Sequence, residues 1–246
     1  MFVASRSALV SDSMKSPRPN RIWPVARSTV CGTGTKLARN ALGNSRIRCS
    51  TFSATTPGTN QWLRQVWAKT ETVPGLPLAE ADYTALALEL AVREVNGWSD
   101  ILKTQLGRIE NPDRKGRFQF VMPALSADPA ERERWYVSLK DVNNRRREPW
   151  VLEGLNYVHH PLRAEASRKD VQSSLDMLWE IQKTGDIFFP KRWLDSVLGG
   201  HSSKEVADTV RAFLKNLPAN YPDRLRNITL QSADELFRAA AIVKKD

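Results

Sequence analysis

Apolar residues recur every three or four positions from about Thr59 to the end of the chain, in stretches separated by short breaks that contain Pro, Gly or Asn. This spacing places the apolar side chains on one side of a helix. Nowhere do apolar and polar residues alternate over several positions beside hairpin turns, so no strand is predicted. We therefore expect an all-α body of about nine or ten helices, each of about 10–18 residues.

Local signals mark where several of these helices begin. A broad apolar arc predicts one helix over residues 78–95, and Ser99 is expected to cap the next one. Asn111-Pro112 and Asp128-Pro129 each place a side-chain oxygen before a proline, an order that suits the first turn of a helix. Two helices are therefore predicted to start at these dipeptides.

Further signals come from the second half of the chain. Apolar spacing predicts one helix over residues 169–183, and Gly199-Gly200 ends the helix that follows it. A serine three positions before a glutamate forms a capping box, which predicts two later starts: Ser202 with Glu205, and Ser232 with Glu235.

The predicted helices suggest an architecture for residues 59–246. Consecutive antiparallel helices with short connections would stack as an irregular HEAT-like solenoid, although no strict repeat period occurs. A body of this length buries about 70% of the surface of its unfolded chain, so we expect it to fold without help.

Residues 1–58 differ from this body in composition and charge. The chain has 37 Lys and Arg against 27 Asp and Glu, and residues 1–70 hold 11 of the basic residues but only one acid, Asp12. The remaining 26 residues of each sign balance. Residues 1–58 are rich in Ser and Arg and lack apolar periodicity, so we expect a disordered segment. It would be an organelle transit peptide, a plain tail or an artefactual start.

The sequence lacks the motifs of several classes of function. No run reaches the roughly 18–20 apolar residues of a membrane span. The sequence contains no HExxH, GxSxG, Walker A or GxGxxG string. The only cysteines, Cys31 and Cys49, lie outside the body, so a disulfide framework or thiolate zinc site is excluded there. The basic segment has too few aromatic residues for base stacking, and nucleic-acid binding is not expected.

The three histidines are His159, His160 and His201. Adjacent histidines on a helix point about 100° apart, so His159 and His160 cannot bind one ion from one face. Pro161 follows them, and we interpret the pair as a helix carboxy-terminal end, where imidazoles meet the negative end of the dipole. A loose metal site that includes His201 is a weaker alternative to helix-end or surface histidines.

Two cationic stretches have both a structural and a functional interpretation. The arginine run at residues 145–147 could bind an acidic partner, but the solvated face of a helix beside Glu148 is favoured. Residues 186–193, DIFFPKRW, place three aromatic residues and two cations at a junction between helices. A hydrophobic plug with Arg192 stacked on an aromatic ring is favoured over the rim of a cavity.

Four blocks of the body resemble the carboxy-terminal helical domain of aminopeptidase N-like zinc metallopeptidases, especially bacterial alanyl-type members. They are NPDRKGRFQFVMPALSADP (111–129), REPWVLEGLNYVHHPLR (147–163), EIQKTGDIFFPKRWLDSVLGGH (180–201) and YPDRLRNITLQSADELFRA (221–239). The resemblance covers about residues 78–239, roughly two thirds of the chain.

The resemblance implies part of an enzyme that removes single residues from peptide amino termini. In that family a thermolysin-like domain carries HExxH and GxMEN, its zinc polarises the scissile carbonyl and activates water, and the helical domain closes the chamber. This sequence has neither motif. The resemblance therefore implies a chamber-closing domain that has no catalytic residue or zinc of its own and is inactive alone. Its partner would be the catalytic domain or a peptide substrate.

Chamber-facing residues are sought among the polar side chains of the resembling blocks: His159, His160, Arg163, Lys191, Arg192 and His201. The alternative function is an independent helical-repeat scaffold that binds a peptide or a partner protein. The surface distinguishes the two, because a domain that docks on a catalytic domain should expose a contiguous apolar patch of several hundred Å².

Overall fold

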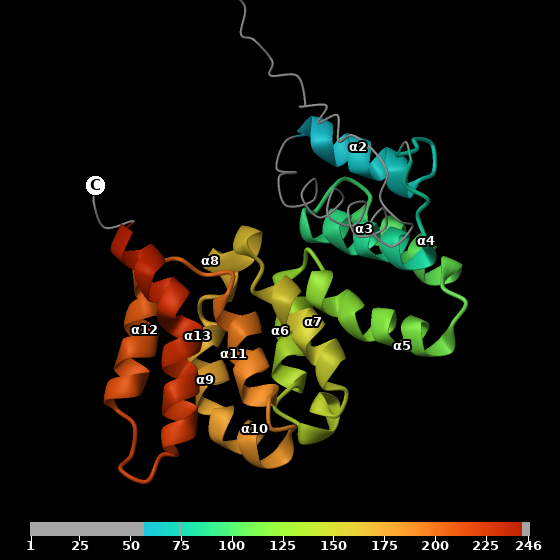
Figure 1. Ribbon diagram of the computed structural model, residues 1–246. Helices are drawn as coiled ribbons and strands as arrows, with labels where there is room; N and C mark the ends of the chain where they lie inside the picture. Colours follow the sequence, from blue (N-terminus) through green and yellow to red (C-terminus); the bar gives the residue numbers. More distant parts are fainter. Residues whose placement is uncertain (1–56, 74, 243–246) are drawn as a thin grey trace, which may run out of the picture.

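The computed structural model describes residues 57–73 and 75–242, which form twelve α-helices and three short 3₁₀ helices (Figure 1). No β-strand occurs among these residues, so the predicted all-α class is confirmed. The helices are more numerous than expected and range from 4 to 20 residues. The prediction for residues 1–58 lies outside the described residues, except that Pro57 and Gly58 open the first described helix.

The first three described helices pack on one another: α2 (Pro57–Trp67), α3 (Glu80–Val92) and α4 (Trp98–Arg108). Their core contains one buried polar side chain, Gln105, whose Oε1 accepts a hydrogen bond from Trp67 Nε1 at 3.0 Å. The prediction that Ser99 caps α4 is wrong. The cap is Gly97, at a φ of 75° that favours glycine, and Ser99 lies inside the first turn.

The next elements are α5 (Pro112–Val121), the 3₁₀ helix η1 (Met122–Leu125) and α6 (Pro129–Ser138). Both predicted Asx-Pro starts are confirmed. Asn111 Oδ1 accepts from the Arg114 amide at 3.0 Å, and Asp128 Oδ1 accepts from the Ala130 amide at 2.9 Å. These bonds satisfy amides that a helix start leaves without an intrahelical partner.

The arginine run does not form a uniform solvated face. Arg145 ends the 3₁₀ helix η2 (Val142–Arg145) and is only 3% exposed. Its guanidinium donates to the carbonyl oxygens of Leu139 and Lys140 and pairs with Glu180. These acceptors compensate in part for the burial of the charge, since Arg145 Nε has no hydrogen-bond partner among the described residues. The predicted solvent exposure holds only for Arg146 and Arg147, which precede α7 (Glu148–Val158).

The single helix predicted over residues 169–183 is wrong, because Met177 separates α9 (Asp170–Asp176) from α10 (Leu178–Thr184). The break coincides with a tertiary hydrogen bond. Trp193 Nε1 donates to the Ser174 carbonyl at 3.2 Å, and this carbonyl is the acceptor that the Leu178 amide would use in a continuous helix. The preceding short elements are η3 (Pro161–Arg163) and α8 (Ala164–Ser167).

Three longer helices complete the fold: α11 (Phe189–Leu198), α12 (Lys204–Lys215) and α13 (Asp223–Ile242). The helix predicted to end at the Gly199-Gly200 pair does end there, but the cap of α12 is Ser203 rather than Ser202. The predicted start at Ser232 is also wrong, because this serine lies inside α13 and its hydroxyl bonds to Asp195 at 2.8 Å.

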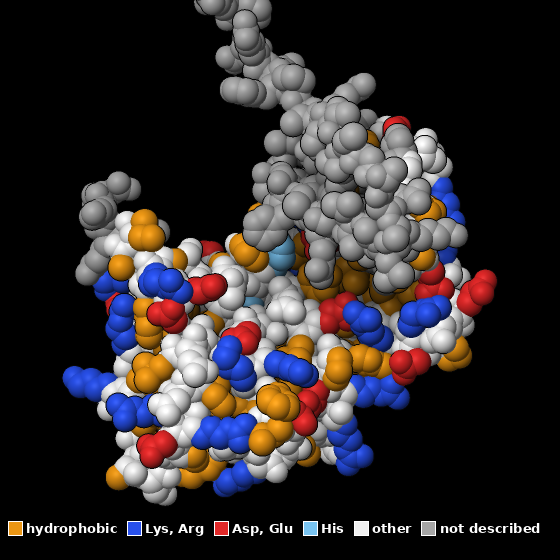
Figure 2. Space-filling model, viewed as in Figure 1, with side chains coloured by type: hydrophobic (Ala, Val, Ile, Leu, Met, Phe, Trp, Pro, Cys, Tyr) orange, Lys and Arg blue, Asp and Glu red, His pale blue; other side chains and the backbone are white. Residues whose placement is uncertain are grey.

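The largest apolar core lies between α7, α9, α11 and the last two helices, with the fully buried Trp193 and Phe189 among its members. Because α11 packs on both α7 and α13, the end of α11 is held at a fixed place beside the end of α7. Lys, Arg, Asp and Glu side chains are interspersed over α10 to α13 on the face shown in Figure 2. Within the described part of the chain, no helix has both the length and the apolar character that a membrane span requires.

Candidate functional site

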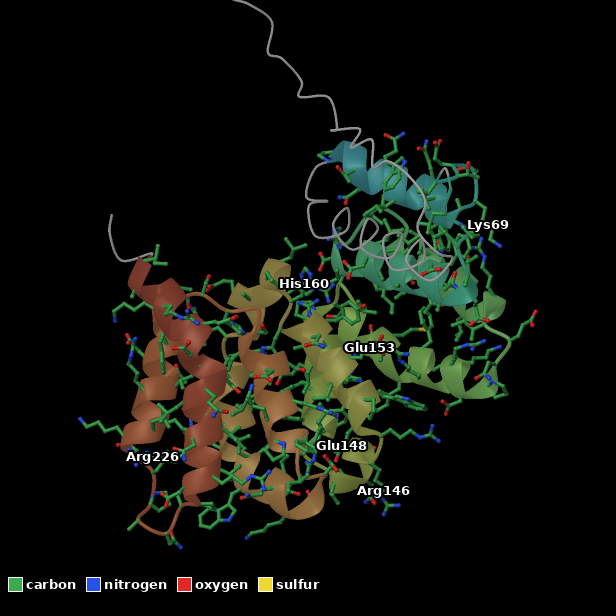
Figure 3. The ribbon with its side chains drawn as sticks, in the orientation of Figure 1. Lys69, Arg146, Glu148, Glu153, His160 and Arg226 are labelled. Carbon is green, nitrogen blue, oxygen red and sulfur yellow. The ribbon has the colours of Figure 1, made fainter. Side chains whose placement is uncertain are left out.

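A cavity of about 450 Å³ lies where α7 and α11 end beside α3. In Figure 3, Glu148 marks the start of α7 and His160 the turn just beyond its end. The floor and walls come from three segments: Glu89 on α3 with Arg93 just after its end, residues 156–162 at the end of α7, and residues 195–200 at the end of α11. The carboxy-terminal turns of two helices therefore share one cavity.

Gly200 brings these two ends together. A Cβ atom at this position would lie 1.7 Å from the backbone oxygen of His159, so no side chain fits without a backbone shift. The close approach places the next residue, His201, against His159. His159 Nδ1 and His201 Nε2 are 3.0 Å apart, which is hydrogen-bond distance.

The two imidazoles form a buried neutral pair. Burial, with a contribution from His201, lowers the pKa of His159 to about 3, and burial lowers the pKa of His201 to about 4. His159 Nε2 is buried without a hydrogen-bond partner among the described residues. An unpaired lone pair costs less than an unpaired N–H, so the arrangement favours a proton on His159 Nδ1, donated to His201 Nε2.

Acidification is expected to destabilise the fold through this pair. The pKa values of both histidines in the folded protein lie below the ordinary 6.5. At a pH between these values and 6.5, the unfolded chain therefore binds more protons than the folded protein. The contribution of the neutral pair to the free energy of unfolding is fully present above about pH 6.5 and is lost as the pH falls toward 4. We expect the unfolding free energy, measured with urea at pH 7 and at 5, to fall by at most about 1.4 kcal/mol per pH unit for each histidine.

The His159→Asn variant supplies the comparison for this measurement. Burial raises the pKa of Asp170 to about 6, so Asp170 titrates in the same pH range and stabilises the fold as the pH falls. The histidine contribution is therefore the difference in pH dependence of the unfolding free energy between wild type and variant. A shallower pH dependence in the variant is expected. An unchanged dependence would contradict the assignment to the histidine pair.

The charged groups at the cavity are already paired with one another. Arg93 donates to Glu89 at 2.5 Å, and Lys191 donates to both oxygens of Asp195. His160 Nδ1 accepts from the Leu162 amide at 3.2 Å, and burial lowers the pKa of His160. A neutral imidazole with its Nδ1 occupied carries its proton on Nε2, so His160 offers a donor.

The structure places the six predicted site residues at different locations. His159 and His160 line the cavity, His201 lies behind His159, and Lys191 is linked to the cavity through Asp195. Arg163 is 5% exposed and donates to the carbonyl oxygens of Ala124 and Leu125, so it fastens η3 to η1.

Arg192 lies away from the cavity, over the ring of Phe188 at 5.9 Å, as the plug interpretation of residues 186–193 expects. Phe189 and Trp193 are buried there, while Phe188 and Ile187 are exposed. The junction is therefore a plug on one side and an apolar surface on the other.

Glu89, Arg93 and Asn156 also line the cavity and were not predicted. A signal existed for the first two, because an acid and a base four positions apart within an otherwise apolar helix stretch form a pair on one face. Asn156 carries no such pattern. Its place follows only from the packing of α7 on α11.

Within residues 57–73 and 75–242, no three His, Cys, Asp or Glu side chains are placed to hold a metal ion. The class that the described residues define is an all-helical domain, with twelve α-helices in that part of the chain. Comparisons with protein-family models, with curated proteins and with solved structures find no match.

Proposed function

We propose that this chain is the chamber-closing, carboxy-terminal helical domain of a zinc aminopeptidase. One observation carries the proposal: two of the blocks that resemble this family line the same cavity. The block at residues 147–163 contributes Asn156 and the turn after α7, and the block at residues 180–201 contributes the end of α11. Stretches more than 30 residues apart thus converge on one concave surface.

The chemistry of the cavity suits a peptide. The last carbonyl groups of a helix lack intrahelical partners, and two helices end here. Their negative dipole ends favour a positive charge such as a free amino terminus. His160 adds a donor, and the side chain of Asn156 adds both a donor and an acceptor.

We also propose that the helices form the irregular HEAT-like solenoid expected of such a domain. The order of contacts along the chain supports this, because α2 packs on α3, α3 on α4 and α4 on α5. Later neighbours also pack, with α6 on α7, α9 on α10, α10 on α11 and α12 on α13, while α7 also packs on α11.

In this proposal the chain supplies shape and polar contacts but no catalytic group. Zinc in the catalytic domain would polarise the scissile carbonyl and activate water. The donor set of the described residues does not fit zinc, so no step of hydrolysis is assigned to this chain.

The purified chain is expected to show no aminopeptidase activity. We would incubate it with zinc and with alanyl, leucyl and arginyl aminomethylcoumarin substrates, using a zinc aminopeptidase as the positive control. Release of coumarin at the background rate is expected, because HExxH and GxMEN are missing from the sequence. Turnover that follows the protein through two purification steps would contradict the proposal.

The native species provides a second test. The endogenous protein, captured through its carboxy-terminal region, should give an intact mass well above 27.8 kDa and peptides that contain HExxH. A species of 27.8 kDa or less would instead favour the scaffold function.

The independent scaffold is the second candidate, and the junction before α11 favours an interaction surface. Ile187 and Phe188 are 57% and 60% exposed. Their backbone is held in place, because Arg224 donates to the Ile187 carbonyl and the Asp186 amide donates to Glu148, both at 2.7 Å. A fixed pair of exposed apolar side chains is a contact point for a partner.

A further inference from the structure

A second cavity, of about 340 Å³, lies between α9, α10 and the carboxy-terminal turn of α12. Three aromatic side chains line it: Trp179, Phe213 and Tyr221. The Tyr221 ring meets the Trp179 ring edge to face at 5.4 Å between centroids and the Phe213 ring at 6.0 Å. The residues that line it belong to α9, α10 and the last part of α12 and to the turn that follows, which lies at the lower end of α12 in Figure 1. None of them lines the cavity at the end of α7.

One of the residues that line this cavity, Asp176, carries a negative charge. Asp176 lines it, and only its Oδ1 is engaged, by Gln172 Nε2 at 2.8 Å. Among the described residues Asp176 forms no ion pair. The end of α12 at Asn216 also faces the cavity, and the carboxy-terminal end of a helix carries a partial negative charge.

Tyr221 adds an unsatisfied polar group. Its hydroxyl oxygen is buried and has no hydrogen-bond partner within residues 57–73 and 75–242. Burial, together with Asp176, raises the pKa of Tyr221 to about 12, so the hydroxyl stays protonated at neutral pH.

The chain already places one cation on this aromatic group. Lys183 Nζ lies 5.2 Å from the centroid of the Trp179 ring, four positions along α10. Aromatic faces attract ammonium and guanidinium groups because of their quadrupole. Lys183 is exposed and can leave the ring, so a ligand would compete with it for the Trp179 face.

We propose that this cavity is a binding site for an organic cation, that is, an ammonium or guanidinium group on an aliphatic stem. The aromatic rings would contact the stem and the face of the cation. Asp176 and the end of α12 would supply the opposite charge. The site is separate from the cavity at the end of α7 and does not depend on the proposed function.

The test uses the full ¹⁵N-labelled chain and four small probes followed by NMR. Two are free cations, n-butylammonium and n-butylguanidinium. One is a side chain on a peptide backbone, Nα-acetyl-arginine N-methylamide, and one is its neutral counterpart, Nα-acetyl-norleucine N-methylamide. We expect saturable shifts of the Asp176, Trp179 and Asn216 amides with millimolar dissociation constants for the cations, and none for the neutral probe. Tighter binding of the free cations would indicate a small organic cation as the ligand, and tighter binding of the arginine derivative would indicate a side chain of a peptide.

Matched variants locate the site. Asp176→Asn should weaken cation binding about fivefold and Trp179→Leu about tenfold. Lys183→Gln, which removes the competing cation, should leave binding unchanged or tighter. The control is Asp208→Asn, an exposed carboxylate on α12 that pairs with Arg211 and does not line the cavity. Equal binding of the neutral probe, or full binding by Asp176→Asn, would overturn the proposal.

Discussion

Replacing Trp193 by alanine is expected to destabilise the protein by about 3–5 kcal/mol, the usual cost of removing a fully buried aromatic side chain. Trp193 is 0% exposed, packs against Phe189 in the largest core and donates its indole N–H to Ser174. The substitution leaves a cavity between α9 and α11 and frees the Ser174 carbonyl. Urea unfolding followed by far-ultraviolet circular dichroism measures the change.

Phe188→Ala is the matched control for Trp193. Phe188 lies at the other side of the same junction and is 60% exposed, so its removal should change the unfolding free energy by no more than about 0.5 kcal/mol. Similar losses in the two variants would show that the core does not lie where the structure places it.

Replacing Gly200 by alanine is expected to cost about 3 kcal/mol or more, at the upper end of the range for overpacking. The new Cβ would meet the His159 backbone oxygen at 1.7 Å, and a backbone oxygen cannot rotate away. The ends of α7 and α11 must separate. His201 then moves away from His159 and becomes more hydrated, so its pKa should rise toward the ordinary value of 6.5.

Two measurements check this variant. Urea unfolding gives the loss of stability, and ¹H–¹⁵N spectra of the histidine rings give their titration. Gly107→Ala on α4 is the control, because a Cβ there meets nothing within 4 Å and alanine favours a helix over glycine. Equal stability of the two variants would contradict the close approach at Gly200.

Part of the cavity at the ends of α7 and α11 could be predicted from the sequence, and part could not. His159 and His160 were predictable as a helix end, because a proline follows them and α7 does end at Val158. The sequence placed them at an end or on the surface, but the structure buries His159 to 1% exposure. Burial depends on Gly200, 41 positions away, and no local pattern reports such an approach.

The sequence by itself determined the features that depend on neighbours within one or two helical turns. The apolar spacing defined the all-α class, and a side-chain oxygen before a proline defined the starts at Asn111 and Asp128, because the bonding amides lie two or three positions away. The balanced charge of the body followed from counting.

Only the tertiary structure decided the features that depend on distant partners. The helix break at Met177 coincides with a bond from Trp193 to a carbonyl 19 positions earlier, and the buried Arg145 bonds to Glu180 and two carbonyl oxygens. The contact of His201 with His159 is of the same kind. Local spacing fixes backbone hydrogen bonds, whereas these side chains bond to groups that packing alone brings near.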